Sequence, residues 1–194
     1  MNAIPKFVAP DREQYHRYFK RHLAKLSPNS EWISRMLASW SAGLGALPDG
    51  LGLEATEFHG LVNDFFHTLV IPAKAPSGRT ADFSRMLEKD DLTRYLLARA
   101  AYPERQETGW ITSILVAGCL GDDHLWQDLG LWSRQDLSGL IAYNFPEIAA
   151  ANTHDMKWKK FLYKQLCEAE GIYVCRAPSC AVCVDYSRCF GSEE

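Results

Sequence analysis

Apolar residues recur along most of the chain at intervals of three and four positions. These apolar stripes cover residues 15–26, 33–44, 58–69, 83–96, 110–118, 137–141 and 158–169. No sustained alternation with a period of two occurs, and no segment repeats another. Because an α-helix places every third or fourth side chain on one face, this spacing predicts an all-α fold. The stripe over residues 83–96 is compatible with one helix or with two short ones, and the stripe over residues 110–118 predicts a more buried helix.

The first boundary between helices is predicted at Pro28. This proline is expected to stop the helix of residues 15–26, because its ring blocks helical continuation. Asn29 or Ser30 is then expected to cap a second helix, whose apolar side extends to Leu44. The glycine-rich stretch that follows contains no G-K-S/T and no preceding strand, so a phosphate-binding P-loop is excluded.

Capping residues also predict helix ends in the second half. Ser133 and Asp136 have the spacing of a capping box, and Pro146 is expected to open another short helix. The last helix is expected to begin near residues 152–153 and to stop at Gly171, because glycine commonly ends helices. The prediction is therefore a helical domain over residues 1–170, completed within the same domain by an irregular cysteine-rich loop over residues 171–194.

Length, composition and charge narrow the class of protein. The chain has 194 residues, of which 47% are hydrophobic and 23% are charged, and its net charge is −3. These values suit one globular domain and exclude a binder that holds nucleic acid by positive charge. The apolar run of residues 111–120 is about half the ~20 residues that span a bilayer. The beginning of the chain does not resemble a secretory signal. We therefore expect a cytoplasmic protein that does not bind membranes.

The clearest chemical signal is four cysteines near the end of the chain. Cys175, Cys180, Cys183 and Cys189 follow the spacing C-x4-C-x2-C-x5-C. A regular helix would bring Cys180 and Cys183 to one face but would leave the other two elsewhere. In a reducing compartment such a cluster favours metal binding over disulfides, and metal ligation can supply the energy that folds a short loop. We therefore predict that these four thiolates bind one metal centre.

The spacing favours an iron–sulfur cluster over zinc. Zinc sites with four cysteines commonly pair two C-x2-C units across a longer gap, whereas this segment contains one. The x4 and x2 gaps match the plant-type ferredoxin pattern. Two functions stay open on these grounds: a zinc-stabilised interaction module, and an iron–sulfur protein for electron transfer or redox sensing. The chain shows no motif for hydrolysis, so a conventional enzyme is disfavoured.

Two segments resemble the NifQ family. The first is MKWKKFLYKQLCEAEGIYVCRAPSCAVCVDYSRCFG (residues 156–191), with the same cysteine spacing, and the second is CLGDDHLWQDLGL (residues 119–131). The resemblance implies a molybdenum–iron–sulfur cluster on Cys175, Cys180, Cys183 and Cys189. It further implies a carrier, not an enzyme, that donates molybdenum during assembly of the nitrogenase iron–molybdenum cofactor. The implied partners are the nitrogenase iron protein, the cofactor-assembly scaffold, and molybdate or another molybdenum source.

Other candidate groups receive simpler interpretations. Cys119 and Cys167 lie in apolar helical segments and are expected to be buried core thiols. His124, beside two aspartates, is a candidate for a pH-sensitive group or an accessory molybdenum ligand. We favour instead a helix-capping or surface histidine. The basic run of Lys157, Lys159, Lys160 and Lys164 suggests steering of molybdate. We instead favour an ordinary solvated face, because these lysines lie largely opposite the apolar stripe.

Overall fold

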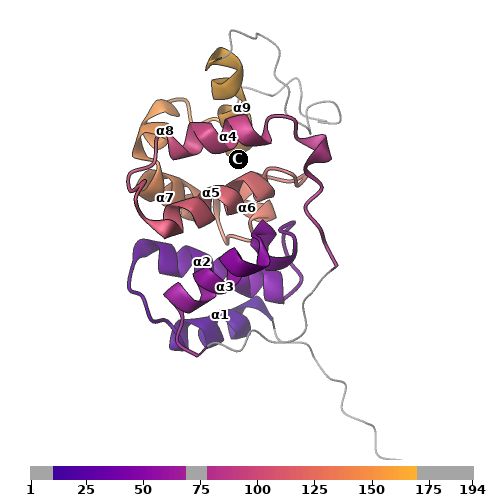
Figure 1. Cartoon of the computed structure of the whole chain (residues 1–194), viewed down its shortest axis with the longest axis vertical. Coiled ribbons are helices and arrows are strands. Elements are labelled where there is room, and N and C mark those ends of the chain that lie inside the picture. The colour runs from indigo at the N-terminus through magenta and orange to yellow at the C-terminus, as the bar shows by residue number, and fades with distance from the viewer. Residues whose placement is uncertain (1–10, 69–77, 170–194) are drawn as a thin grey trace, which may run out of the picture.

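The structure is a computed structural model that describes residues 11–68 and 78–169 (Figure 1). The α-helices within these ranges are α1 (Arg12–Arg21), α2 (Pro28–Ser41), α3 (Ala55–Phe65), α4 (Lys89–Leu97), α5 (Gln106–Gly118), α6 (Leu125–Asp128), α7 (Arg134–Asn144), α8 (Pro146–Ala151) and α9 (Trp158–Ala169). Two 3-10 turns, η1 (Asp49–Gly52) and η2 (Phe83–Arg85), join them. Apart from one isolated bridge between Leu23 and Phe66, these residues form no β-structure. The all-α prediction is confirmed for this part of the chain, and residues 171–194 lie outside it.

The helices stack in an order that places α9 far from the first helices. Figure 1 shows α1, α2 and α3 at one end, α5 and α7 in the middle, and α4, α8 and α9 at the other end. Nearly every side chain of α5 from Trp110 to Ala117 is buried. A helix that is apolar on all sides must be surrounded by others, so α5 forms the centre of the core. Its predicted position in the interior is confirmed.

The predicted boundary at Pro28 is wrong in its details. Ser27 is the N-cap of α2 and Pro28 is its first helical residue, so the proline opens this helix. Proline is well suited to that position, since the amide hydrogen it lacks would have no helical partner there. Asn29 and Ser30, expected as caps, instead lie buried in the first turn, where the Ser30 hydroxyl donates to the Lys25 carbonyl at 2.6 Å.

Two apolar stripes also extend beyond the helices they predicted. Helix α1 ends at Arg21, and Leu26 lies in the connection that follows with 94% of its surface exposed. Helix α2 ends at Ser41, and Leu44 is likewise exposed. The stripe over residues 83–96 is divided between η2 and α4. Periodicity therefore located the helices but extended them too far, because capping and turn geometry determine where a helix ends.

The second half follows its predicted caps until α9. The Ser133 hydroxyl accepts from the Asp136 amide at 3.1 Å, and Pro146 opens α8, so both predictions are confirmed. The predicted start of α9 at residues 152–153 is wrong. Asn152 ends α8, and its side chain bonds to both the amide and the carbonyl of Met156 at 2.9 Å. Asn152 therefore closes the loop between α8 and α9 and does not cap α9, which begins at Trp158.

No helix among the described residues is long and apolar enough to cross a membrane. The longest, α2, has 14 residues, and it carries polar side chains along its length.

Candidate functional site

The four predicted ligands Cys175, Cys180, Cys183 and Cys189 lie outside the described residues, as does the predicted helix stop at Gly171. The last described element is α9, which ends at Ala169, six positions before Cys175. Within residues 11–68 and 78–169, no group of three histidine, cysteine, aspartate or glutamate side chains has an arrangement that could hold a metal ion. Among the described elements, α9 is therefore the nearest to the four cysteines along the chain.

Helix α9 is held to the body by apolar packing and by polar contacts at both of its ends. Its buried face consists of Trp158, Phe161, Leu162, Tyr163 and Leu166. Near its start, the Trp158 indole nitrogen donates to the Ser138 hydroxyl of α7 at 3.1 Å. Nearer its end, the Tyr95 hydroxyl of α4 donates to the Gln165 side chain at 3.4 Å. The helix that leads toward the cysteine segment is thus anchored on α4 and α7.

A buried ion pair joins the first turn of α9 to the segment before α7. The Lys159 ammonium contacts the Asp128 carboxylate and donates to the Gly121 carbonyl at 2.6 Å. The Asp128 side chain is 3% exposed and that of Lys159 is 12% exposed. Both charges have therefore lost most of their hydration, and each depends on the other for compensation. We call Asp128, Lys159 and the Gly121 carbonyl the α9 clasp.

The turn that contains Gly121 fits closely around the carboxylate of the α9 clasp. A Cβ atom on Gly121 would lie 2.3 Å from Asp128 Cγ, so this position has room only for glycine. The backbone amide of Asp123 also stabilises the charged carboxylate. Burial raises the pKa of the Asp128 carboxyl above its ordinary value, and the Lys159 ammonium opposes that rise.

Cys119 lies beside the clasp and behaves as a core thiol. Its side chain is buried, and burial raises the pKa of this thiol to about 12, with smaller effects from the Lys159 and Asp128 charges. A thiol with so high a pKa is almost wholly protonated at neutral pH, and thiols react as thiolates. The prediction of a buried thiol is confirmed for Cys119. Cys167, in the last turns of α9, is only partly buried, so the prediction of a buried core thiol is wrong for this residue.

His124 has the structural role that was favoured. It is the N-cap of the short helix α6, where its backbone amide donates to the Gln127 side chain at 3.2 Å. The side chain of His124 completes the reciprocal capping arrangement. The neighbouring Asp122 and Asp123 are both exposed. The capping interpretation of His124 is thus confirmed, and α6 positions Asp128 at its last residue.

The basic run of α9 does not form one solvated face. Lys159 lies inside the α9 clasp, so the expectation of an ordinary surface lysine is wrong for this residue. Lys164 pairs with Glu168 along the helix at 3.5 Å, while Lys157 and Lys160 are partly buried. The sequence carried a signal that was missed: Asp128 stands among apolar residues in LWQDLGL, where an unpaired carboxylate would be costly.

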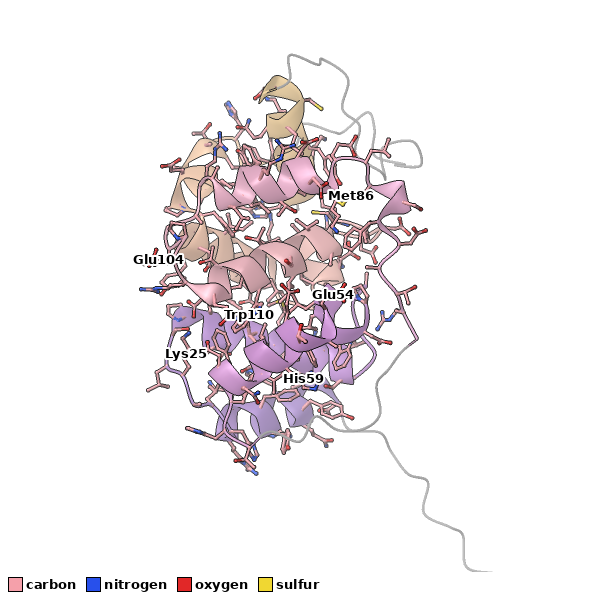
Figure 2. The ribbon with its side chains drawn as sticks, in the orientation of Figure 1. Lys25, Glu54, His59, Met86, Glu104 and Trp110 are labelled. Carbon is pink, nitrogen blue, oxygen red and sulfur yellow. The ribbon has the colours of Figure 1, made fainter. Side chains whose placement is uncertain are left out.

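A second buried polar group, also missed from the sequence, lies between α2, α5 and α7. The side-chain amide of Asn29 donates to Glu107 Oε1 at 3.1 Å and to the Asn144 side-chain oxygen at 2.9 Å. The Lys25 ammonium contacts Glu107 and pairs with Asp64 at 2.7 Å. Figure 2 shows Lys25 and Glu104 along the same edge of the molecule. We call Asn29, Glu107, Asn144 and Lys25 the amide cluster.

Comparisons with known proteins give consistent results. The sequence model of the NifQ family matches residues 32–191. Protein NifQ of Azotobacter vinelandii is 41% identical over 174 residues, which cover 85% of this chain and 89% of the relative. Protein NifQ of Rhodobacter capsulatus is 36% identical, with 83% and 87% covered. The Protein NifQ homolog of Sinorhizobium fredii (strain NBRC 101917 / NGR234) is 35% identical, with 84% and 70% covered. No solved structure matches the chain.

Proposed function

The chain belongs to the NifQ family, and from this premise we propose that it is a cytoplasmic carrier of a molybdenum–iron–sulfur cluster in nitrogen fixation. Cys175, Cys180, Cys183 and Cys189 hold the cluster. The carrier donates molybdenum for assembly of the nitrogenase iron–molybdenum cofactor. Its partners are the nitrogenase iron protein and the cofactor-assembly scaffold, and it receives molybdenum from molybdate or another source. It acts as an accessory protein and not as an enzyme.

The observation that carries this proposal is the cysteine spacing C-x4-C-x2-C-x5-C. Four thiolates are a soft donor set that suits iron–sulfur chemistry better than hard cations. The family match extends to residue 191 and therefore includes all four cysteines. The described helices offer no competing group of metal-binding side chains within residues 11–68 and 78–169.

The arrangement of the helical body also suits a carrier. Helix α9 ends six positions before the first predicted ligand and is anchored on α4 and α7 by the contacts of Gln165 and Trp158. All four predicted ligands follow α9 in the chain, and none is among the buried residues around α5. A carrier must hold its cargo firmly and still surrender it to a partner, and a ligand set that takes no residue from this core allows release without unfolding it.

Metal analysis of the full chain after anaerobic isolation tests the proposal. We expect a coloured protein that contains iron and molybdenum and shows the electron paramagnetic resonance signal of a cluster. Cys180→Ser and Cys183→Ser should each lose most of the iron, because each removes a ligand. Cys119→Ala is the matched control: it removes a thiol that lies in the core, so the metal content should stay at the level of the unmodified chain.

Three outcomes would contradict the proposal in different ways. A colourless protein with one zinc ion and no iron would favour a zinc-stabilised interaction module. Iron without molybdenum uptake, together with reversible one-electron chemistry, would favour an electron-transfer or redox-sensing protein. A loaded chain that transfers no molybdenum to the assembly scaffold would reject the role as a donor.

A further inference from the structure

We propose that the α9 clasp is a positioning device: the Asp128–Lys159 ion pair sets the placement of α9 and, through it, the start of the cysteine segment. The effect on the cysteine segment rests on the proposed function. The effect on α9 itself stands on the geometry alone. Neither residue belongs to the predicted ligand set, so both act through α9 and not by contact with the cluster.

The clasp has the burial and connectivity that such a device needs. Asp128 is the last residue of α6 and Lys159 is the second residue of α9, so the pair joins elements 31 positions apart in the chain. Lys159 also donates to the Gly121 carbonyl at 2.6 Å. The Lys159 ammonium thus contacts oxygen atoms at both ends of the segment of residues 121–128. Sliding or rotation of α9 would break at least one of these contacts.

Apolar packing would not by itself define the position of α9 so narrowly. The buried residues of α9 include Phe161, Leu162 and Leu166, and burial of apolar surface has little dependence on direction. A buried ion pair is directional, and moving it apart leaves two poorly hydrated charges. Lys159 is ten residues from Ala169, and a helix rises ~1.5 Å per residue, so the two positions are about 15 Å apart. Near the Ala169 end the polar anchor is the 3.4 Å hydrogen bond from Tyr95 to Gln165, which is longer than the Lys159 contact with the Gly121 carbonyl. A small tilt at Lys159 therefore becomes a larger displacement at the end of α9.

The amide cluster provides a matched control. Glu107 is as deeply buried as Asp128, with 2% of its side chain exposed, and it also contacts a lysine. It lies in the first turn of α5, and its contacts are with residues outside α9. Glu107→Gln should therefore weaken the fold without a selective effect on α9. Any selective loss in Asp128→Asn can then be separated from a general loss of stability.

Hydrogen exchange on the metal-free full chain tests the first part of the proposal. In Asp128→Asn and in Lys159→Met, exchange should speed up throughout the chain, but the acceleration for the amides of residues 160–169 should exceed the acceleration for those of α2 by at least ~10-fold. In Glu107→Gln, the exchange of α2, α5 and α9 should change together. If α9 exchange stays the same in both clasp variants, or if it only follows α2, the clasp does not position α9 and the proposal is overturned. Two clasp variants are used so that poor folding of one does not decide the result.

Cluster loading tests the second part. Asp128→Asn should bind at least ~3-fold less iron per chain than Glu107→Gln under the same anaerobic reconstitution, with a changed electron paramagnetic resonance signal in the fraction that loads. Normal loading with a loosened α9 would overturn the link to the cysteine segment. If the unmodified chain binds no cluster, the proposed function fails, and the exchange measurement alone then decides whether the clasp positions α9.

Discussion

Asp128 and Glu107 are both buried carboxylates, but the protein compensates their charges in different ways. Asp128 depends mainly on one ammonium, that of Lys159, which is itself 12% exposed. Glu107 shares its charge among the Asn29 amide, the Lys25 ammonium and the first turn of α5. The positive end of the α5 dipole also favours a carboxylate at this position. Lys25 keeps 35% of its side chain exposed and therefore keeps much of its hydration.

The two sites thus differ in the number of groups that compensate the buried charge: mainly one for Asp128 and several for Glu107. When a buried charge has a single partner, removing that partner leaves it almost uncompensated. When several groups share the charge, removing one leaves the others in place, and the cost approaches that of one lost hydrogen bond. The α9 clasp should therefore be the more sensitive of the two sites, although both are equally hidden from water. Variants of the two sites test this ordering.

The largest effect is expected from Lys159→Met. This change leaves the Asp128 carboxylate buried without its cation, and we expect the free energy of unfolding to fall by about 3–5 kcal/mol. The double variant Asp128→Asn/Lys159→Met should recover much of that loss, because it removes both charges. Urea denaturation of the three proteins measures the difference. If Lys159→Met lowers the free energy of unfolding by less than about 1 kcal/mol, the Asp128 charge does not depend mainly on Lys159.

The pH dependence of that loss provides a further check. Burial already raises the pKa of Asp128, and removing Lys159 takes away the main group that opposes the rise. A carboxyl with a raised pKa binds its proton more tightly in the folded state, so its effect on folding becomes less favourable as the pH rises through that pKa. The loss in Lys159→Met should therefore be larger at pH 8 than at pH 5. Equal losses at the two pH values would contradict a charge-based account.

A smaller effect is expected in the amide cluster. Asn29→Ala removes donors to Glu107 and Asn144 but leaves the Lys25 ammonium and the α5 dipole in place. The expected loss is about 1–3 kcal/mol, the cost of leaving buried hydrogen-bonding groups unsatisfied. The same urea titrations give the comparison directly. If Asn29→Ala costs more than Lys159→Met, the proposed ordering of the two sites is wrong.

The reactivity of Cys119 should distinguish the two sites without denaturation. Its pKa of about 12 keeps the thiol protonated in the folded protein, so alkylation at pH 8 should be very slow. Asp128→Asn should speed the alkylation of Cys119, because Cys119 lies beside the clasp, whereas Glu107→Gln should change it little. Mass spectrometry of the peptide that contains Cys119 measures this rate. Fast alkylation in the unmodified chain would contradict the buried position of this thiol.

The smallest effect is expected from His16, which must be separated from the clasp in any pH titration. Burial lowers the pKa of His16, with Glu31 partly opposing the change at 3.3 Å. A histidine with a lowered pKa favours folding above its ordinary pKa, and this contribution is lost as the pH falls toward 5. Asp128 acts in the opposite sense. Chemical denaturation of His16→Gln at pH 7 and pH 5 should show a weaker acid destabilisation than the unmodified chain.

Much of the fold was predictable because it depends on local physics. The spacing of residues such as Ile33, Met36 and Leu37 located α2, and the Ser133–Asp136 capping box located the start of α7. The predicted helix boundaries were wrong where one residue type suits two different local structures. Pro28 suits the first position of a helix as well as the end of one, and Asn152 closes a loop with Met156 as readily as it caps a helix. Tertiary packing selects between these uses, and the local sequence does not.

The buried polar sites were not predictable in the same way. Nothing near Lys159 in the chain distinguishes it from Lys157 or Lys160, and its partner Asp128 is 31 positions away. Asn29 and Asn144 of the amide cluster are 115 positions apart. Apolar context marks Asp128 as a costly residue, but it does not identify the cation that compensates the charge.

The sequence by itself determined the helical class, the interior position of α5 and the four clustered cysteines, because periodicity, composition and motif spacing are properties of neighbouring residues. The tertiary structure alone decided that Lys159 is an internal cation, that Gly121 leaves room for the Asp128 carboxylate, and that Cys119 is a thiol with a pKa of about 12. Burial and charge pairing depend on which distant segments meet, and only the packed helices bring those segments together.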